Sequence, residues 1–127
     1  MGMEQTVSFA GKPVPEYTAV RDFLGQRGFP LQMGMIDGQL AFPDELPEDS
    51  WHELRLRTLQ GMVTVRRDGE RLIFVTWGNA DAAMRQAWNA LVWAFAAVGG
   101  GQIETPEGPV DAASYQNRVE LPANFRG

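Results

Sequence analysis

Two Asp-Gly pairs, Asp37-Gly38 and Asp68-Gly69, constrain the fold of this chain more than any other feature. Each pair lies between extended runs of alternating apolar and polar residues, which is the strongest short-range signal for a β-hairpin. Across the first turn, four apolar residues fall on one face: Met33 and Met35 with Leu40 and Phe42. Across the second turn, two apolar pairs stand opposite each other: Val65 with Leu72, and Val63 with Phe74. The sequence therefore predicts two antiparallel hairpins.

The run between these hairpins has the reverse phase, because its apolar residues are Leu54 and Leu56. Side chains alternate strictly along a strand, so the phase has to change before the next strand begins. Gln60-Gly61 is the natural place, as a third tight turn or as a bulge. Taken as a turn, it gives a meander with six apolar side chains on one face: Leu54, Leu56, Val63, Val65, Leu72 and Phe74.

Helical periodicity appears in two segments. Residues 80–98 form a long amphipathic pattern, which the three glycines at 99–101 end. Its apolar stripe contains Met84, Ala87, Trp88, Leu91, Val92, Phe95 and Val98. A shorter helix is expected over residues 15–27, with Pro15 in its first turn and Gly28 placed to end it.

These elements predict an α+β fold. An antiparallel meander sheet of about five or six strands packs against the long helix (80–98) and the shorter N-terminal helix (15–27). A strand at 6–9, a small hairpin at 102–110 and a short helix from Asp111 to Val119 complete the pattern. Because the chain has 127 residues, we expect one globular domain over 1–127, with residues 122–127 frayed. The order of elements and the acidity are similar to those of small acidic type III secretion chaperones, but a shared fold does not give a function.

Composition excludes several classes of site and partner. The chain has no cysteine, which excludes disulfides, thiolate metal sites and a cysteine nucleophile. A net charge of −5 disfavours non-specific binding to nucleic acid, because phosphate contacts need a basic surface. The first fifteen residues do not have the pattern of a secretory signal, and the apolar run at 90–98 is too short to span a bilayer. We therefore expect a soluble cytoplasmic protein with no nucleic-acid partner and no membrane partner.

The Trp77-Gly78-Asn79 corner before the long helix is the first candidate site. Helix N-termini attract anions because their first amides have no partner. Asn79 is predicted to be the N-cap, and Asp81 adds a carboxylate to the first turn. The helix then supplies its own cap and its own negative charge, so the corner is interpreted as a structural connection between strand and helix and not as an anion-binding site. The glycines at 99–101 follow a helix and lack the lysine of a phosphate loop, so they are interpreted as a C-cap.

His52 is the one histidine of the chain and lies among the carboxylates of residues 44–53. A metal site would need three or four ligands, mostly His or Cys, and the spacing does not match a calcium loop. A general base would need a nucleophile, but Ser8, Ser50 and Ser114 lie in no recognised motif. The sequence therefore predicts a solvated acidic loop, with no metal, no cofactor and no catalytic residue.

Three arginines, Arg55, Arg66 and Arg71, are predicted to line up across three strands on the second face of the sheet, with Arg57 nearby. Like charges directly opposite one another are destabilising, so a negative charge should offset them. Either the acidic loop 44–53, which carries five carboxylates, or an anionic partner can do so, and pairing with the loop is the more economical interpretation. If the loop lies elsewhere, this row becomes the best candidate for a partner-binding patch.

Three tryptophans, Trp51, Trp77 and Trp93, complete the candidate partner-binding residues, because large aromatic residues often anchor interfaces. Residues 90–98 are apolar almost all round, whereas a helix on a two-layer domain needs one apolar stripe. The second face, with Trp93, therefore needs another cover. The segment 102–121 is one candidate, but its polar composition favours a second copy of the chain in a homodimer.

Three classes of function follow from these residues. The favoured one is a small acidic non-enzymatic module that binds itself or another protein. The alternative is a small-molecule-binding domain or enzyme with a pocket between sheet and long helix, lined by Met33, Met35, Trp77 and Trp88. A nucleic-acid binder that uses the arginine row is disfavoured by the net charge.

Overall fold

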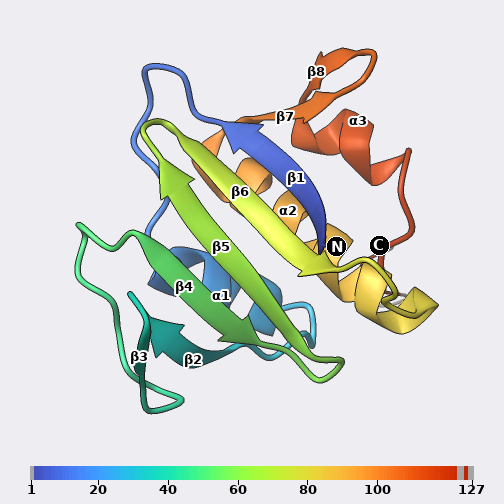
Figure 1. Cartoon of the computed structure of the whole chain (residues 1–127). Coiled ribbons are helices and arrows are strands. Elements are labelled where there is room, and N and C mark those ends of the chain that lie inside the picture. Colours follow the sequence, from blue (N-terminus) through green and yellow to red (C-terminus); the bar gives the residue numbers. More distant parts are fainter. Residues whose placement is uncertain (1, 123–124, 126–127) are drawn as a thin grey trace.

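In the computed structural model, which describes residues 2–122 and 125, eight strands form one antiparallel sheet accompanied by three helices (Figure 1). The strands are β1 (Gly2–Ser8), β2 (Gln32–Ile36), β3 (Gln39–Leu40), β4 (Glu53–Arg57), β5 (Met62–Asp68), β6 (Arg71–Trp77), β7 (Gln102–Thr105) and β8 (Gly108–Val110). The helices are α1 (Tyr17–Gly25), α2 (Ala82–Gly99) and α3 (Ala112–Gln116). This confirms the α+β class, but the strand count exceeds the predicted five or six.

The strand order is β3-β2-β4-β5-β6-β1-β7-β8. The predicted meander forms its centre, with the turn at residues 58–61 between β4 and β5. The strand predicted at 6–9 is the longer β1, which pairs with β6 over its whole length, and the additional width comes from β7 and β8 on the other side of β1. The small C-terminal hairpin thereby joins the same sheet instead of standing apart from it.

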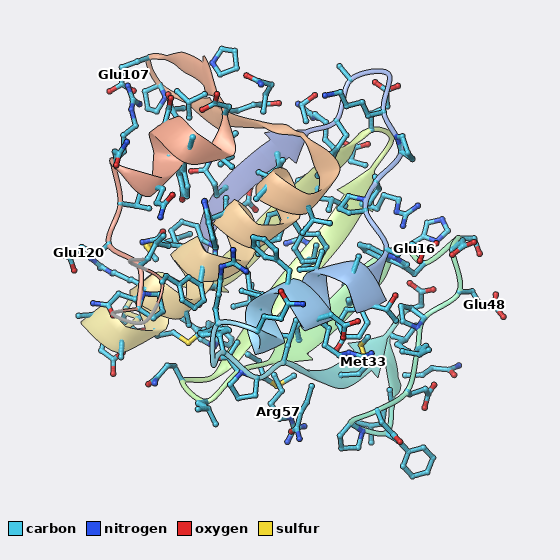
Figure 2. The ribbon with its side chains drawn as sticks, turned by 180° about the vertical axis from the view of Figure 1, so that it is seen from behind. Glu16, Met33, Glu48, Arg57, Glu107 and Glu120 are labelled. Carbon is cyan, nitrogen blue, oxygen red and sulfur yellow. The ribbon has the colours of Figure 1, made fainter. Side chains whose placement is uncertain are left out.

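The helices lie on one side of the sheet, and the core lies between them and the sheet (Figures 1 and 2). The six apolar side chains predicted to share a face are fully buried there, which confirms the phase change at the β4–β5 turn. Phe95 of α2 packs against Phe74 of β6 with ring centroids 5.2 Å apart. The described helices leave the opposite face of the sheet uncovered (Figure 1). None of them is long and apolar enough to cross a membrane.

The register of the β5–β6 hairpin differs from the predicted one. Val65 stands opposite Phe74, and Asp68 stands opposite Arg71, because the two-residue turn is Gly69-Glu70. Gly69 has a φ of +62°, which glycine adopts readily. The shift is two residues, so each side chain keeps its predicted face.

The first hairpin departs from the prediction at Gly34. Asp37 and Gly38 form the predicted turn, both with positive φ, and Met35 stands opposite Leu40. A bulge between Met33 and Met35 then reverses the phase of the side chains, so that Met33 is the one residue of the four whose side chain lies in the core. A Cβ at Gly34 would come within 2.9 Å of the Arg55 carbonyl oxygen, so only glycine fits. The predicted shared face of Met33, Met35, Leu40 and Phe42 is wrong.

The cap of the long helix is also different from the predicted one. Asp81, not Asn79, is the N-cap of α2, and its Oδ1 accepts a hydrogen bond of 2.8 Å from the Met84 amide. Gly100 adopts a left-handed conformation with φ of 67° and ends the helix, as the glycine run predicts. Asp111 caps α3 in the same way by accepting from Ser114.

We expect Asp81→Ala to lower the free energy of unfolding by about 1 kcal/mol, because the Met84 amide loses its acceptor. Asn79→Ala is the matched control and should change stability by less than about 0.5 kcal/mol. Urea unfolding of the three proteins measures both values. Equal costs for the two substitutions would contradict the assignment of the cap.

Trp93 lies in the core rather than on an exposed helix face, with 6% of its surface accessible. The rings of Phe23 and Phe125 lie 5.3 and 5.6 Å from the Trp93 ring, and the Arg27 guanidinium lies 5.5 Å from it. The cover predicted from a second copy or from residues 102–121 is thus supplied by α1 and Phe125. Residues 123–124 and 126–127 of the segment expected to fray lie outside the described residues.

Candidate functional site

The uncovered side of the sheet, the open face, carries the side chains that alternate with the core residues. It includes Glu4 and Thr6 of β1, Arg55 and Arg57 of β4, Thr64 and Arg66 of β5, and Arg71, Ile73, Val75 and Trp77 of β6. Ile73 and Val75 are half-buried, while the four arginines are exposed. The open face therefore combines a small apolar centre with exposed cations.

The arginines do not stand opposite one another as predicted. Arg55 pairs in register with Thr64, and Arg66 stands opposite Glu53. Arg71 stands opposite Asp68 because of the two-residue shift in the β5–β6 hairpin. None of these three arginines therefore stands directly opposite another, and the repulsion expected of an aligned row does not arise.

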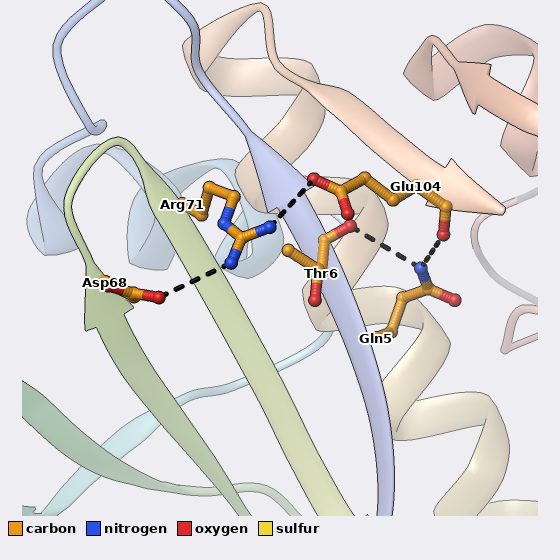
Figure 3. A network of polar contacts seen from close by, with 5 residues as sticks. All are labelled: Gln5, Thr6, Asp68, Arg71 and Glu104. Carbon is orange, nitrogen blue, oxygen red and sulfur yellow. Dashed lines mark hydrogen bonds and ion pairs between the residues drawn. The ribbon is translucent and has the colours of Figure 1, made fainter.

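Two of the arginines have ion-pair partners within the sheet. An Arg66 guanidinium nitrogen lies 4.0 Å from Glu4 Oε2. Arg71 bridges three strands, lying 3.4 Å from Asp68 and 3.7 Å from Glu104 (Figure 3). These partners come from β1, β5 and β7, so the predicted pairing of the arginines with the acidic loop 44–53 does not form.

Arg55 and Arg57 differ from Arg66 and Arg71. Within residues 2–122 and 125, neither guanidinium makes an ion pair or a side-chain hydrogen bond. The carboxylates of Asp44, Glu45 and Glu48 likewise make no ion pair with a described cation. Charges of both signs that make no ion pair with a described residue thus lie near the β3 edge of the sheet, although Glu45 Oε1 accepts a hydrogen bond of 3.1 Å from the Phe42 amide.

Exposed apolar side chains gather at the same edge. Leu40 is 86% exposed and Phe42 is 77% exposed, on the segment where β3 ends and the acidic loop begins. We call residues 40–45 the edge segment. Trp77, at the end of β6, is 73% exposed on the open face. Of the three predicted tryptophans, only Trp77 is available on the surface for a partner.

The edge segment was missed as a candidate because the alternating pattern assigns Leu40 and Phe42 to a covered face. The bulge at Gly34 and the two-residue length of β3 remove that cover. A signal was present in the residues that follow, since Pro43 and the acidic run cannot continue a central strand.

The predicted pocket between sheet and long helix does not form from its four residues. Met33 belongs to the core, whereas Met35 and Trp77 belong to the other side of the sheet. Trp88 is half-buried and donates its indole N–H to the Phe74 carbonyl oxygen at 3.1 Å. The four side chains therefore line no common space.

A cleft of about 970 Å³ lies elsewhere, between the start of α1, the loop at 46–49 and the C-terminal end of α2. Figure 2 shows Glu16 and Glu48 on two sides of this region. We call it the α1 cleft. Trp51 lines it and is 4% exposed, with the Arg67 guanidinium 4.3 Å from its ring centroid. Trp51 is therefore placed by an internal cation–π contact.

Two residues that line the α1 cleft each have one side-chain polar atom that is buried from solvent and makes no hydrogen bond with a described residue: the Tyr17 hydroxyl and Arg67 Nε. Burial raises the pKa of Tyr17, and the Arg21 charge opposes that rise only in part, so the hydroxyl stays protonated at neutral pH. Burial lowers the pKa of Arg67, against the charges of Asp37 and Asp49, but guanidinium remains a cation. Both groups are therefore hydrogen-bond donors.

His52 contacts Asp37 through its backbone amide. Its amide and that of Glu53 donate to Asp37 Oδ1 at 2.7 and 2.8 Å. These two hydrogen bonds hold the pKa of Asp37 below its usual value, and the bond from the Glu53 amide has the larger effect. Among the described residues, no group of three His, Asp or Glu side chains is arranged to hold a metal ion.

No protein-family model, no curated protein and no solved structure shows a significant match to this chain. Its function is therefore argued from the two surfaces described above. The open face with the edge segment offers charge and apolar area to a macromolecule, and the α1 cleft offers aromatic side chains and a guanidinium to a small molecule.

Proposed function

We propose that this chain is a non-enzymatic protein-interaction module, and that the open face of one copy binds the edge segment of a second copy. The observation that supports it is complementarity within one chain. Arg55 and Arg57 lie on the open face and make no ion pair with any residue that the structure describes, and the edge segment carries Asp44 and Glu45 beside two exposed apolar side chains.

The arrangement suits a symmetric dimer. Because the strand order at this end is β3-β2-β4, the edge segment begins about 10 Å from the β4 arginines, which is two strand spacings. Donor and acceptor patches therefore lie side by side on each copy, as a two-fold interface requires. Each interface would then use both patches of both copies.

The two kinds of contact have different roles. Burying Leu40 and Phe42 supplies most of the free energy of association, at about 1.5–3 kcal/mol for each fully buried side chain. The ion pairs contribute orientation and specificity more than affinity. Dimerisation would also remove the largest exposed apolar side chains of the β3 edge from water.

The apolar contact is tested by measuring the mass of the chain by light scattering across micromolar concentrations. We expect the native chain to be a dimer and the double variant Leu40→Ser/Phe42→Ser to be a monomer of unchanged stability. Leu59→Ser is the matched control, because Leu59 is 78% exposed in the β4–β5 turn and is not part of the edge segment. A native chain that remains monomeric at high micromolar concentration contradicts the proposal.

Small-molecule binding in the α1 cleft is a second candidate function, because this cleft of about 970 Å³ is lined by the aromatic residues Tyr17 and Trp51 beside the Arg67 guanidinium. Nucleic acid and membranes are not proposed as partners, since the chain carries a net charge of −5. The cytoplasm remains the proposed location.

A further inference from the structure

We infer that the N-terminal part of β1 binds a short basic peptide in extended conformation, which pairs antiparallel with residues 2–5 and adds a strand to the sheet. We call residues 2–5 the β1 edge. This inference goes beyond the proposed dimer, since it concerns a different strand and a partner that is not a second copy of this chain.

β1 has a neighbouring strand along its whole length on one side only. Every residue of β1 stands opposite a residue of β6, whereas only Val7 and Ser8 stand opposite residues of β7. Beyond this short pairing, β7 runs away from β1 towards β8 and α3 (Figure 1). Among the residues that the structure describes, the β1 edge therefore has no strand on its second side.

The hydrogen bond at the end of β1 shows which backbone groups point to that second side. The Phe9 amide donates to the Glu70 carbonyl oxygen at 2.9 Å, in line with the β1–β6 pairing. In an antiparallel pair every second residue directs both its N–H and its C=O to the same neighbour, so Met3 and Gln5 bond to β6. Gly2 and Glu4 then direct their backbone groups to the second side. An exposed row of such groups is a template for an added strand.

The side chain of Gln5 limits the length of this row. Its Nε2 donates to the Glu104 carbonyl oxygen at 2.5 Å and lies 3.5 Å from the Thr6 carbonyl oxygen (Figure 3). Gln5 thereby fills the place where β7 leaves β1. An added strand pairs with residues 2–5 alone, so a short segment is enough.

The charges beside the β1 edge favour a basic partner. β1 and β7 each contain one charged residue, Glu4 and Glu104, and neither strand contains a cation. The side chain of the peptide residue opposite Glu4 lies on the open face beside it, so a lysine or arginine there forms an ion pair. Pairing with β1 of a second copy would instead bring the carboxylates of both copies together, which is unfavourable.

Trp77 supplies a second contact for a cation. It stands opposite Gly2 and is 73% exposed on the open face. Because Gly2 has no side chain, a lysine opposite it can reach across to the indole ring and form a cation–π contact. Met3 and Gln5 are half-buried on the helix side of the strand, where apolar side chains of the peptide would pack. The matching peptide therefore alternates basic and apolar residues.

The test is a titration of the full chain with acetyl-Lys-Val-Lys-Val-Lys-amide, followed by amide NMR. In the paired peptide the lysine N–H groups point to β1 and the valine N–H groups point away. Methylation of the lysine backbone nitrogens removes these hydrogen bonds and keeps the charge, and methylation of the valine nitrogens is the matched control. We expect the peptide methylated at lysine to bind at least about tenfold more weakly than the control.

Hydrogen exchange locates the added strand. We expect the amides of Gly2 and Glu4 to shift in the titration and the exchange of the Glu4 amide to become slower. The Met3 and Gln5 amides are internal controls, because they bond to β6 in the free chain and their exchange should change little.

Substitutions separate the two contacts of the peptide. Glu4→Lys should bind it about tenfold more weakly, and Glu4→Gln, which adds no cation beside Arg66, about threefold more weakly. Trp77→Ala should remain folded and bind it about threefold more weakly. Glu48→Lys is the matched control, because it changes the net charge as Glu4→Lys does, on an exposed loop residue away from β1.

Four results would overturn the inference. They are no shift of the Gly2 and Glu4 amides, equal binding of the two methylated peptides, and equal binding by Glu4→Lys and Glu48→Lys. The fourth is slow exchange of the Glu4 amide in the free chain, which would mean that a second copy already pairs with the β1 edge. Each can also occur in the monomeric variant Leu40→Ser/Phe42→Ser, so this inference and the proposed dimer fail independently.

Discussion

Trp93→Ala is expected to lower the free energy of unfolding by about 3–5 kcal/mol, the range for large aromatic residues removed from a core. The Trp93 ring is 6% exposed and packs between Phe23 and Phe125. Removing it leaves a cavity beneath α1 that these neighbours can fill only in part. Trp77→Ala is the matched control, because Trp77 is 73% exposed, and it should cost no more than about 0.5 kcal/mol.

Chemical denaturation of the two variants and the native chain measures this difference. Similar costs for Trp93 and Trp77 would contradict the placement of Trp93 in the core. A small cost for Trp93 together with loss of dimer mass would instead restore the helix-face interface that the sequence predicts.

Leu72→Ala is expected to cost about 2–5 kcal/mol, whereas Arg66→Ala should cost less than about 1 kcal/mol. Leu72 is fully buried under the helices, and its removal leaves a cavity. Arg66 is on the open face, and its ion pair with Glu4 spans 4.0 Å between half-exposed side chains. Such a pair is screened by water and contributes little.

The same denaturation experiment checks this prediction, with the slope of the transition as an internal control. If Leu72→Ala and Arg66→Ala cost the same, the assignment of the two faces of β5 and β6 is wrong. A change of slope in either variant would mean that the substitution altered the unfolded ensemble rather than the core.

The faces of the central strands could be predicted, although the registers of the β4–β5 and β5–β6 pairs could not. The alternation of Val63, Val65, Leu72 and Phe74 fixes which side each occupies, and a slip of two residues preserves it. The predicted arginine row depended on the register itself, so the same slip separated Arg66 from Arg71. Alternation therefore predicts the face of a side chain more reliably than it predicts the register between two strands.

Gly34 shows where alternation fails. A bulge inserts one residue, so every side chain before it changes face relative to those after it. Nothing in the pattern of Met33 and Met35 distinguishes the bulged strand from a regular one. The exposure of Leu40 and Phe42 follows from this bulge, and only Pro43 and the acidic run after it indicate that no central strand continues there.

Contacts between distant segments account for the remaining differences. The pairing of β1 with β6 joins residues about 70 positions apart, which local periodicity does not report. The cover of Trp93 and the walls of the α1 cleft likewise combine segments from both halves of the chain. The composition of the α1 cleft could therefore not be derived from any one motif.

Mixing two charge-reversed chains tests the proposed interface most directly. Arg55→Glu/Arg57→Glu reverses the open face, and Asp44→Arg/Glu45→Arg reverses the edge segment. Each variant alone places like charges across the interface and should be a monomer, while the control Arg85→Glu, at an exposed position of α2 on the other side of the sheet, should remain a dimer. We predict that native mass spectrometry of the mixture detects a heterodimer of the two variants, in which both reciprocal contacts pair opposite charges, one with the native residues and one with the reversed residues. Two variants that stay monomeric when mixed, or a reversed chain that still forms its own dimer, would contradict the account.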